Sequence, residues 1–287
     1  MKRRTLALAV GLLVFGLGRA SALGPMSWSS AEIARCIRDP GCRPSFVVAH
    51  RANGFGMPED SRAAVRAAIG AGVPIVEIDL RHSADGRIVV LHDPTLNRTT
   101  SMRGDVKEFT AAELGRALLA NGEALPSFEE IYALSRGKAV LDLRFHVDVI
   151  EQAAEWIALQ GSFDDVIFFA ISDDLAKTTA RMRLKYPAMM VMAKAQNWGD
   201  AEKVSALFAR PPEILHPDAI DPEFDRQLHA HGIKAFRNLM APAAADPREL
   251  TNAAEFLGKG FDFLQTDEPV PFLERLPGLQ VRASGGH

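Results

Sequence analysis

Short apolar runs alternate with segments of helical apolar spacing along most of this chain of 287 residues. Runs of this length predict strands, and the segments between them predict amphipathic helices. The expected strands are at residues 45–50, 74–80, 87–92, 138–144, 165–171, 189–194, 233–239 and 261–266. Eight strands that alternate with helices predict an α/β protein with the (β/α)8 TIM barrel fold. A doubly wound open sheet is the alternative, but no Gly-x-Gly-x-x-Gly loop follows the first run.

Helical patterns fill the intervals between these runs. They lie near residues 60–71, 111–118, 127–136, 147–160, 173–185, 200–209, 222–231 and 247–258. Two of them begin with a capping box, because Thr110 is followed by Glu113 and Ser127 by Glu130. No linker-like stretch interrupts the alternation, so one catalytic domain is expected. The expected division of the chain is a signal peptide (1–22), an N-terminal capping segment (23–44), a single barrel (45–280) and a flexible tail (281–287).

The N-terminus has the pattern of a secretory signal. Lys2-Arg3-Arg4 precedes an apolar run, and Ala20-Ser21-Ala22 offers a cleavage site. The run is shorter than the ~20 residues that a bilayer requires, so no stable membrane insertion is expected after cleavage. We therefore expect a periplasmic or secreted protein. Cleavage would change the formal net charge from −3 to −7, and an acidic protein is a poor candidate for nucleic-acid binding.

The chain has two cysteines, Cys36 and Cys42. An oxidising compartment permits a bridge between them, and the turn formed by residues 38–41 would bring them together. A structural disulfide is the expectation, and two free thiols are the alternative.

Polar groups follow or interrupt three of the apolar runs. His50-Arg51 closes the first run, Glu77-Ile78-Asp79 lies inside the second, and His92-Asp93 ends the third. A carboxylate inside a buried strand costs several kcal/mol unless it is paired or binds a metal. In barrel enzymes the reactive groups gather at the C-terminal ends of the strands. The pattern therefore predicts metal-assisted acid–base chemistry.

Strand alternation predicts which of these side chains face inward together. Glu77 and Asp79 are two residues apart and share a face, and two such carboxylates suit a hard cation such as Ca²⁺ or Mg²⁺. The fourth expected strand repeats the pattern, with Asp142 and Arg144 on one face. Asp142 is expected to be a third metal ligand, and Arg144 a cation for an anionic substrate. Asp93 is expected to orient the loop after the third strand.

The segment from Val47 to Thr100 resembles the glycerophosphodiester phosphodiesterases. Members of that family have a His-Arg-Gly opening, a Pro-Glu-Asn-Thr segment, a Glu-x-Asp pair and a His-Asp-x-x-x-x-Arg-Thr-Thr run. The matching segments here are His50-Arg51-Ala52, Pro58-Glu59-Asp60-Ser61, Glu77-Ile78-Asp79, and His92-Asp93 with Arg98-Thr99-Thr100. Two later segments, 125–130 and 260–269, are similar to its Pro-Thr-Leu-Glu-Glu and closing Thr-Asp-x-Pro patterns.

The resemblance implies a (β/α)8 barrel that hydrolyses glycerophosphodiesters to glycerol phosphate and an alcohol. By position, His50 would be the general base and His92 the general acid, a role that suits imidazole near neutral pH. Arg51 would hold the phosphate of a small-molecule phosphodiester substrate. A divalent cation, Ca²⁺ or Mg²⁺, would be held by Glu77, Asp79 and Asp142.

The chain departs from the family pattern at several positions. Asp142 stands where the family usually has Glu, Arg144 where it has Lys, and Ala52 where it has Gly. The family's Trp near the seventh strand is matched by Phe236. These departures leave the histidine pair intact and leave the substrate head group open.

Further residues have two interpretations each. Glu59 would contact the metal site or the substrate, or would only lead a helix. Trp198 would line the substrate pocket, or would only pack. Surface or loop positions without a chemical role are expected for the other histidines, His82, His146, His216, His229 and His231.

Two other functions remain open at this stage. One is a phospholipase C- or D-like enzyme that acts on intact lipid, and the other is a barrel that binds phosphodiesters without turnover. Retention of His50 and His92 argues against the second. The sequence leaves the oligomeric state open.

Overall fold

The computed structural model describes residues 28–43, 45–218, 221–240 and 261–275. The expected signal peptide, the expected tail and the expected helix at 247–258 lie outside these residues.

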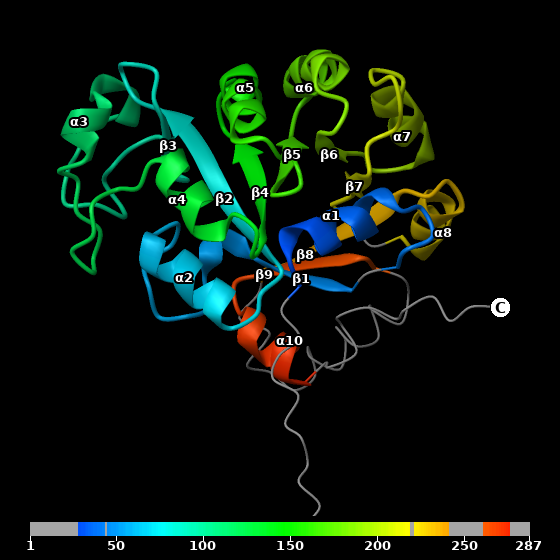
Figure 1. The fold of residues 1–287 in the computed structure, drawn as a ribbon, viewed down its shortest axis with the longest axis horizontal. Helices are drawn as coiled ribbons and strands as arrows, with labels where there is room; N and C mark the ends of the chain where they lie inside the picture. The colour runs from blue at the N-terminus through cyan, green and yellow to red at the C-terminus, as the bar shows by residue number, and fades with distance from the viewer. Residues whose placement is uncertain (1–27, 44, 219–220, 241–260, 276–287) are drawn as a thin grey trace, which may run out of the picture.

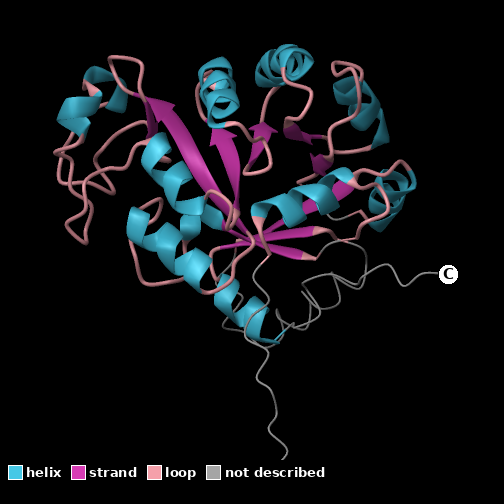
Figure 2. Cartoon of the chain, viewed as in Figure 1, coloured by secondary structure: helices cyan, strands magenta, loops and turns pink. Residues whose placement is uncertain are grey.

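Eight parallel strands form a closed barrel (Figures 1 and 2). Each strand pairs in parallel with the next around the ring, and β1 pairs with both β2 and β9, which closes it. The (β/α)8 TIM barrel expected from the sequence is therefore confirmed. In ring order the strands are β1 (Phe46–Ala49), β2 (Ile75–His82), β4 (Val140–Phe145), β5 (Val166–Ala170), β6 (Met190–Lys194), β7 (Ile214–His216), β8 (Lys234–Leu239) and β9 (Phe263–Thr266).

The third expected strand is not part of this ring. The structure has β3 (Ile88–Val90) antiparallel to the end of β2, outside the barrel. The sequence interpretation also missed β7, which is three residues long and lies between Pro212 and Pro217. The expected total of eight was right because these two errors cancelled.

Helices surround the barrel on its outer side (Figure 2). Both capping boxes are confirmed, at Thr110 and at Ser127, although the first opens a helix of only four residues. The helices that follow α1 are α2 (Arg62–Gly70), α3 (Ala111–Leu114), α4 (Phe128–Ser135), α5 (Ile150–Gln160), α6 (Asp173–Lys185), α7 (Trp198–Ser205), α8 (Pro222–Ala230) and α10 (Pro269–Arg275).

The chain between β3 and α4 forms a small unit with its own core. It contains α3 and the 3-10 helix η2 (Val106–Glu108), and both pack on a cluster that includes Leu96, Leu114 and Leu119. In Figure 1 this unit lies beside the barrel. It begins at Leu91, directly before His92.

Helix α1 (Ser30–Arg38) closes the N-terminal end of the barrel. Its Ile33 and Ile37 join the cluster of inward-facing strand residues, such as Phe46 and Ile75. A disulfide between Cys36 and Cys42 fastens the end of this helix to the following turn. Inward-facing positions are therefore apolar at this end, and the same positions become polar toward the C-terminal ends of the strands.

In the part of the chain that the structure describes, no helix is long and apolar enough to cross a membrane.

Candidate active site

His50 lies at the end of β1, at the start of the short 3-10 helix η1 (His50–Ala52). Its ring is buried, with Nδ1 2.8 Å from Oδ1 of Asp267 and Nε2 4.0 Å from Oε2 of Glu77. Asp267 follows β9 and also accepts a bond from Asn53 at 3.0 Å. Burial lowers the pKa of His50 despite the hydrogen bond with Asp267. A neutral ring that donates from Nδ1 presents Nε2 as an acceptor toward the barrel mouth.

The backbone after His50 is left-handed at two residues. Arg51 has φ 50° and Ala52 has φ 55°. Side chains disfavour this region by about 1–2 kcal/mol per residue, whereas glycine adopts it freely. The left-handed backbone at Ala52 explains why the family pattern has glycine at this position. In this conformation the Arg51 N–H donates to Oε2 of Glu77 at 2.9 Å.

Three carboxylates lie together inside β2 and β4. Glu77, Asp79 and Asp142 are essentially inaccessible, and Glu77 and Asp142 are register partners on neighbouring strands. Within the described chain, Oε1 of Glu77 and both carboxyl oxygens of Asp142 have no hydrogen-bond partner. Burial raises the pKa of Asp142 to about 8, and burial with the charge of Asp79 raises that of Glu77 well above its ordinary value. Buried, unpartnered carboxyl oxygens are a donor set that fits a divalent cation.

Asp60 is a fourth buried carboxyl, at the position of the family's asparagine. Its φ is 58°, and both of its side-chain oxygens lack a partner in the described chain. Burial raises its pKa, and the charges of Asp79 and Glu59 raise it further. The sequence interpretation gave it no role.

Asp79 differs from the other carboxylates because cations surround it. Nε2 of His146 lies 2.6 Å from its Oδ1, and Nε of Arg51 lies 3.3 Å from its Oδ2. Nε of Arg144 is 3.9 Å away. Burial alone would raise the pKa of Asp79, but the bond and charge of His146, with the charges of His92 and Arg51, lower it. Its pKa therefore shifts in the opposite direction from those of Glu77 and Asp142.

His92 reaches this group from the start of the unit between β3 and α4. Its Nδ1 is 2.7 Å from Oδ1 of Asp93, and its ring meets that of His146 edge to face at 4.9 Å. One potential ligand atom from each of Asp79, His92 and His146 lies within 4.8 Å of the others. Glu77 and Asp142 are not part of this cluster of three side chains in the described chain.

A chain of ion pairs connects the His92 loop to the residues after β1. Arg98 contacts Asp93 at 2.7 and 2.9 Å, and contacts Glu59 at 2.6 and 2.9 Å. Glu59 in turn lies 3.3 Å from Nη1 of Arg51. Burial would raise the pKa of Glu59, but the bonds from Arg98 and the nearby charge of Arg51 lower it. Glu59 therefore contacts two arginines, and the helix that follows begins only at Arg62.

The structure brings together most of the expected site residues but not Trp198. The Trp198 indole donates to Glu202 at 2.9 Å, and its ring packs on His231 at 4.2 Å, away from β1, β2 and β4. His146 lies in the bend after β4, a loop position as expected, but its ring contacts the buried Asp79. His216 was also expected at a surface or loop position, but it is the last residue of β7 and its ring is buried, which corrects that expectation. The signal for His146 was present in the sequence, since Asp142, Arg144 and His146 alternate on one face.

The fold and site define a class, the (β/α)8-barrel hydrolases with histidines and carboxylates at the C-terminal ends of their strands. A model of the glycerophosphoryl diester phosphodiesterase family matches residues 50–158. A glycerophosphodiester phosphodiesterase of Caldanaerobacter subterraneus is 26% identical over 244 residues, which cover 78% of this chain and 95% of that protein. One from Bacillus altitudinis is 34% identical over 118 residues, covering 41% of this chain and 42% of that protein.

Solved structures have the same fold. A glycerophosphoryl diester phosphodiesterase from Parabacteroides distasonis superposes with a TM-score of 0.72 at 22% identity, covering 90% of this chain and 95% of that one. An Oleispira antarctica phosphodiesterase in complex with the product sn-glycerol-3-phosphate gives 0.63 at 22% identity, covering 81% and 97%. Over most of its length the chain is therefore similar to glycerophosphoryl diester phosphodiesterases, and residues 50–158 match the model of that family. It is accordingly an enzyme, a phosphoric diester hydrolase.

Proposed function

We propose that this enzyme hydrolyses glycerophosphodiesters to glycerol phosphate and an alcohol, with His50 and His92 as base and acid and with a divalent metal ion. One observation carries the proposal. Each histidine has its Nδ1 held by a carboxylate, Asp267 or Asp93, beside buried carboxyl oxygens that lack partners. A carboxylate that bonds to one ring nitrogen fixes the tautomer and the orientation of a catalytic imidazole.

Glu77, Asp79 and Asp142 would hold the metal ion. All three offer oxygen ligands, which favours Ca²⁺ or Mg²⁺. When bound, a divalent cation supplies positive charge that stabilises the negative charge of the phosphoryl oxygens. It would also offset the cost of burying Glu77 and Asp142, since Oε1 of Glu77 and both carboxyl oxygens of Asp142 have no hydrogen-bond partner among the described residues.

The two histidines have different tasks. His50 keeps its proton on Nδ1 toward Asp267, so that its Nε2 accepts the proton of the nucleophile. His92 is fixed through Nδ1 by Asp93, so that its Nε2 donates a proton to the leaving alcohol. In both histidines Nδ1 bonds to a carboxylate, and Nε2 is the nitrogen that would exchange a proton during the reaction.

Arg51 and Arg144 would bind the phosphate. Both are partly exposed and both lie within 4 Å of Asp79. Glu59, with Arg98, would set the position of the Arg51 guanidinium, which has a shape suited to two phosphate oxygens. Glu59 then acts on the substrate through Arg51.

We also propose that the protein works in the periplasm or outside the cell. The support is the sequence of residues 1–22 together with the Cys36–Cys42 disulfide, since disulfides persist mainly in oxidising compartments. Fractionation of cells that express the full chain, with N-terminal sequencing of the mature protein, tests this.

Hydrolysis of a panel of glycerophosphodiesters, with release of glycerol phosphate as the readout, tests the activity. Intact phospholipid belongs in the same panel. The exposed large apolar side chains of the described chain are single residues on separate elements, such as Leu159 on α5 and Leu184 on α6, which favours the water-soluble diester. Hydrolysis of lipid alone would replace the proposal with the phospholipase-like alternative, and binding without hydrolysis would replace it with the non-catalytic one.

A further inference from the structure

A second set of polar side chains faces the inside of the barrel, at the C-terminal ends of β6 to β9. Residues beneath them on the same strands, Met192, Ile214, Phe236 and Phe263, belong to the interior cluster. Two residues further along each strand the side chain points the same way. Those positions hold Lys194, His216, Asn238 and Gln265, which we call the polar arc.

The polar arc lies across the barrel from the catalytic residues. In the ring order, β6 is four strands from β1, and β7 is four strands from β2. In a ring of eight strands this separation is the full width of the barrel. A substrate whose phosphate lies beside His50 and Glu77 therefore extends toward His216. The proposed phosphodiester mechanism makes no use of the arc residues.

His216 is the fixed centre of the arc. Its side chain is 4% exposed, and it lies between the rings of Phe169 and Phe236, with centroids 5.4 and 5.0 Å away. Its Nδ1 has no hydrogen-bond partner among the described residues, and the nearest carboxylate oxygen, of Asp218, is 3.8 Å away. Burial lowers the pKa of His216, although a hydrogen bond with Asn238 opposes this. Nδ1 of this buried ring is therefore available to a group that enters from the C-terminal end of the barrel.

The neighbours of His216 offer both donors and acceptors. Lys194 is its register partner, and the Lys194 ammonium bonds to Asp218 at 3.1 Å, which neutralises that carboxylate. On the other side, the Gln265 amide donates to Asn238 Oδ1 at 3.2 Å. Among the described residues, this bond leaves the Gln265 carbonyl oxygen and the Asn238 NH₂ for other partners.

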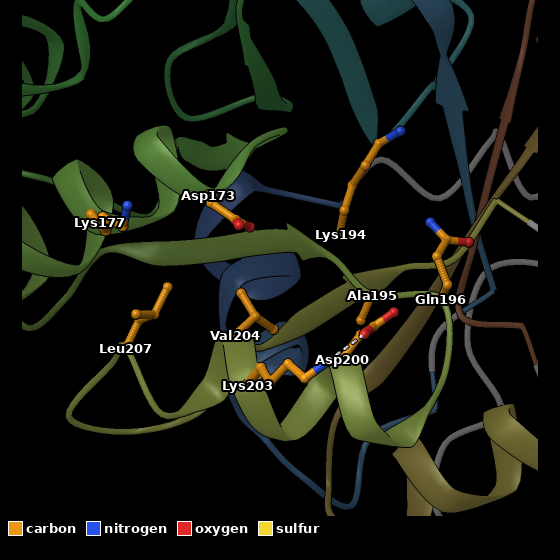
Figure 3. A pocket seen from close by; sticks show the side chains of 9 residues that line it. All are labelled: Asp173, Lys177, Lys194, Ala195, Gln196, Asp200, Lys203, Val204 and Leu207. Atoms are coloured by element: carbon orange, nitrogen blue, oxygen red, sulfur yellow. Dashed lines mark hydrogen bonds and ion pairs between the residues drawn. The ribbon is translucent and has the colours of Figure 1, made fainter.

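A cavity of about 480 Å³ adjoins the arc at Lys194. Figure 3 shows that Lys194 and Gln196 line one side of it, whereas Lys203 comes from α7 and Leu207 from the turn that follows this helix. The Gln196 side chain also bonds to Asp218, at 2.8 Å, so that the wall of the cavity and the arc share one carboxylate. There is room beside the arc for a polar group and its water.

We propose that the polar arc binds the glycerol hydroxyls of the substrate. Hydroxyls both donate and accept, which matches a neutral imidazole flanked by amides. A quaternary ammonium group would instead need open aromatic faces, and Phe169 and Phe236 are buried against His216. This inference rests on the proposed function, because it assigns a binding site to the glycerol part of the glycerophosphodiester, away from the reacting phosphorus.

Binding of two small probes tests the arc separately from catalysis. Glycerol phosphate and inorganic phosphate are titrated calorimetrically into metal-supplemented enzyme. His216→Phe keeps the stacked ring and removes both nitrogens, so Kd for glycerol phosphate should rise about fivefold to tenfold, the loss expected for one or two hydrogen bonds. Kd for inorganic phosphate should stay within twofold. His216→Gln, which retains a donor and an acceptor, should recover part of the loss.

Controls separate this outcome from general damage. His231→Gln, on the exposed surface, should change neither Kd. Asn238→Ala alters an exposed side chain of the arc and gives a second measurement if His216→Phe does not fold. Equal weakening of both probes, or wild-type affinity for glycerol phosphate in both variants, would overturn the inference. Failure of the proposed function would appear differently, as wild-type enzyme that does not hydrolyse glycerophosphodiesters.

Discussion

His50 and Asp267 are 217 residues apart in the sequence, yet Nδ1 of His50 lies 2.8 Å from Oδ1 of Asp267. Closure of the barrel between β1 and β9 brings them together. A bond from Nδ1–H to this carboxylate favours the imidazole tautomer whose Nε2 carries no proton, as the proposed base requires. The last strand of the fold therefore controls a residue at the end of the first.

Asp267→Asn should lower kcat by about 10²-fold or more, because an amide can donate to Nδ1 and favour the wrong tautomer. KM should change little, since Asp267 does not lie beside the proposed phosphate site. Steady-state kinetics with a glycerophosphodiester measure the effect. Asn53→Ala removes the other group bonded to Asp267 and should have a smaller effect. A kcat for Asp267→Asn equal to wild type would show that the contact has no part in turnover.

His92→Ala and His50→Ala should each lower kcat by at least ~10²-fold, the usual contribution of general acid–base catalysis. The fold should survive, since His92 is partly exposed and neither side chain belongs to the apolar core. Circular dichroism and kcat on the same preparations check this. Near-normal turnover by His92→Ala would refute the acid assignment.

Chelation should abolish activity, and Ca²⁺ or Mg²⁺ should restore it. Asp142→Asn and Glu77→Gln each remove a negative charge from the site, so both should weaken metal binding. Asp142→Glu, which restores the residue usual in the family, tests whether the shorter side chain limits affinity. Calorimetric titration of metal into each variant measures the effect. Unchanged affinity in Asp142→Asn would remove this residue from the ligand set.

His146→Gln should weaken metal binding about tenfold or more and lower kcat in parallel. The reason is that His146 orients Asp79 through its 2.6 Å contact, and such supporting groups affect metal affinity by about 10–100-fold. His82→Gln is a matched control, because the His82 ring bonds to the backbone oxygen of Ser83, at 3.0 Å, and contacts no carboxylate of the described chain. Equal metal affinities for the His146 and His82 variants would contradict the prediction.

Arg98→Met should raise KM several-fold, because it releases Glu59 and so loosens Arg51 at the phosphate site. The effect on kcat should be smaller. Glu151→Gln breaks a comparable surface contact, between Glu151 and Arg181 at 2.8 Å on α5 and α6, and should leave both constants unchanged. A matching response of both variants would mean that the Glu59–Arg98 contact has no special role.

The sequence was sufficient for the fold class and for the residues on β1, β2 and β4, because period-two alternation places Glu77, Asp79 and Asp142 on inward faces. It was less informative where an element is short or an interaction is distant. β7 is only three residues long, and β3 has the composition of a barrel strand but pairs antiparallel. The contact of Asp267 with His50 depends on closure of the ring, which no local pattern encodes.

Histidines outside the family motifs show a second limit. His146 and His216 each continue an inward-facing series by two residues beyond a polar or apolar neighbour, so extending the alternation would have located both. The residues that His146 and His216 contact could not be predicted from the alternation. The stacking of His216 between Phe169 and Phe236 requires three strands to be in register.

Helix α1 also has a kinetic consequence. Ile33 and Ile37 fill the N-terminal end of the barrel interior, so within the described chain the catalytic residues face the opposite end. If the diester enters there and both products leave there, glycerol phosphate competes with the next diester for the same site. A rising product concentration is then expected to slow turnover by competition.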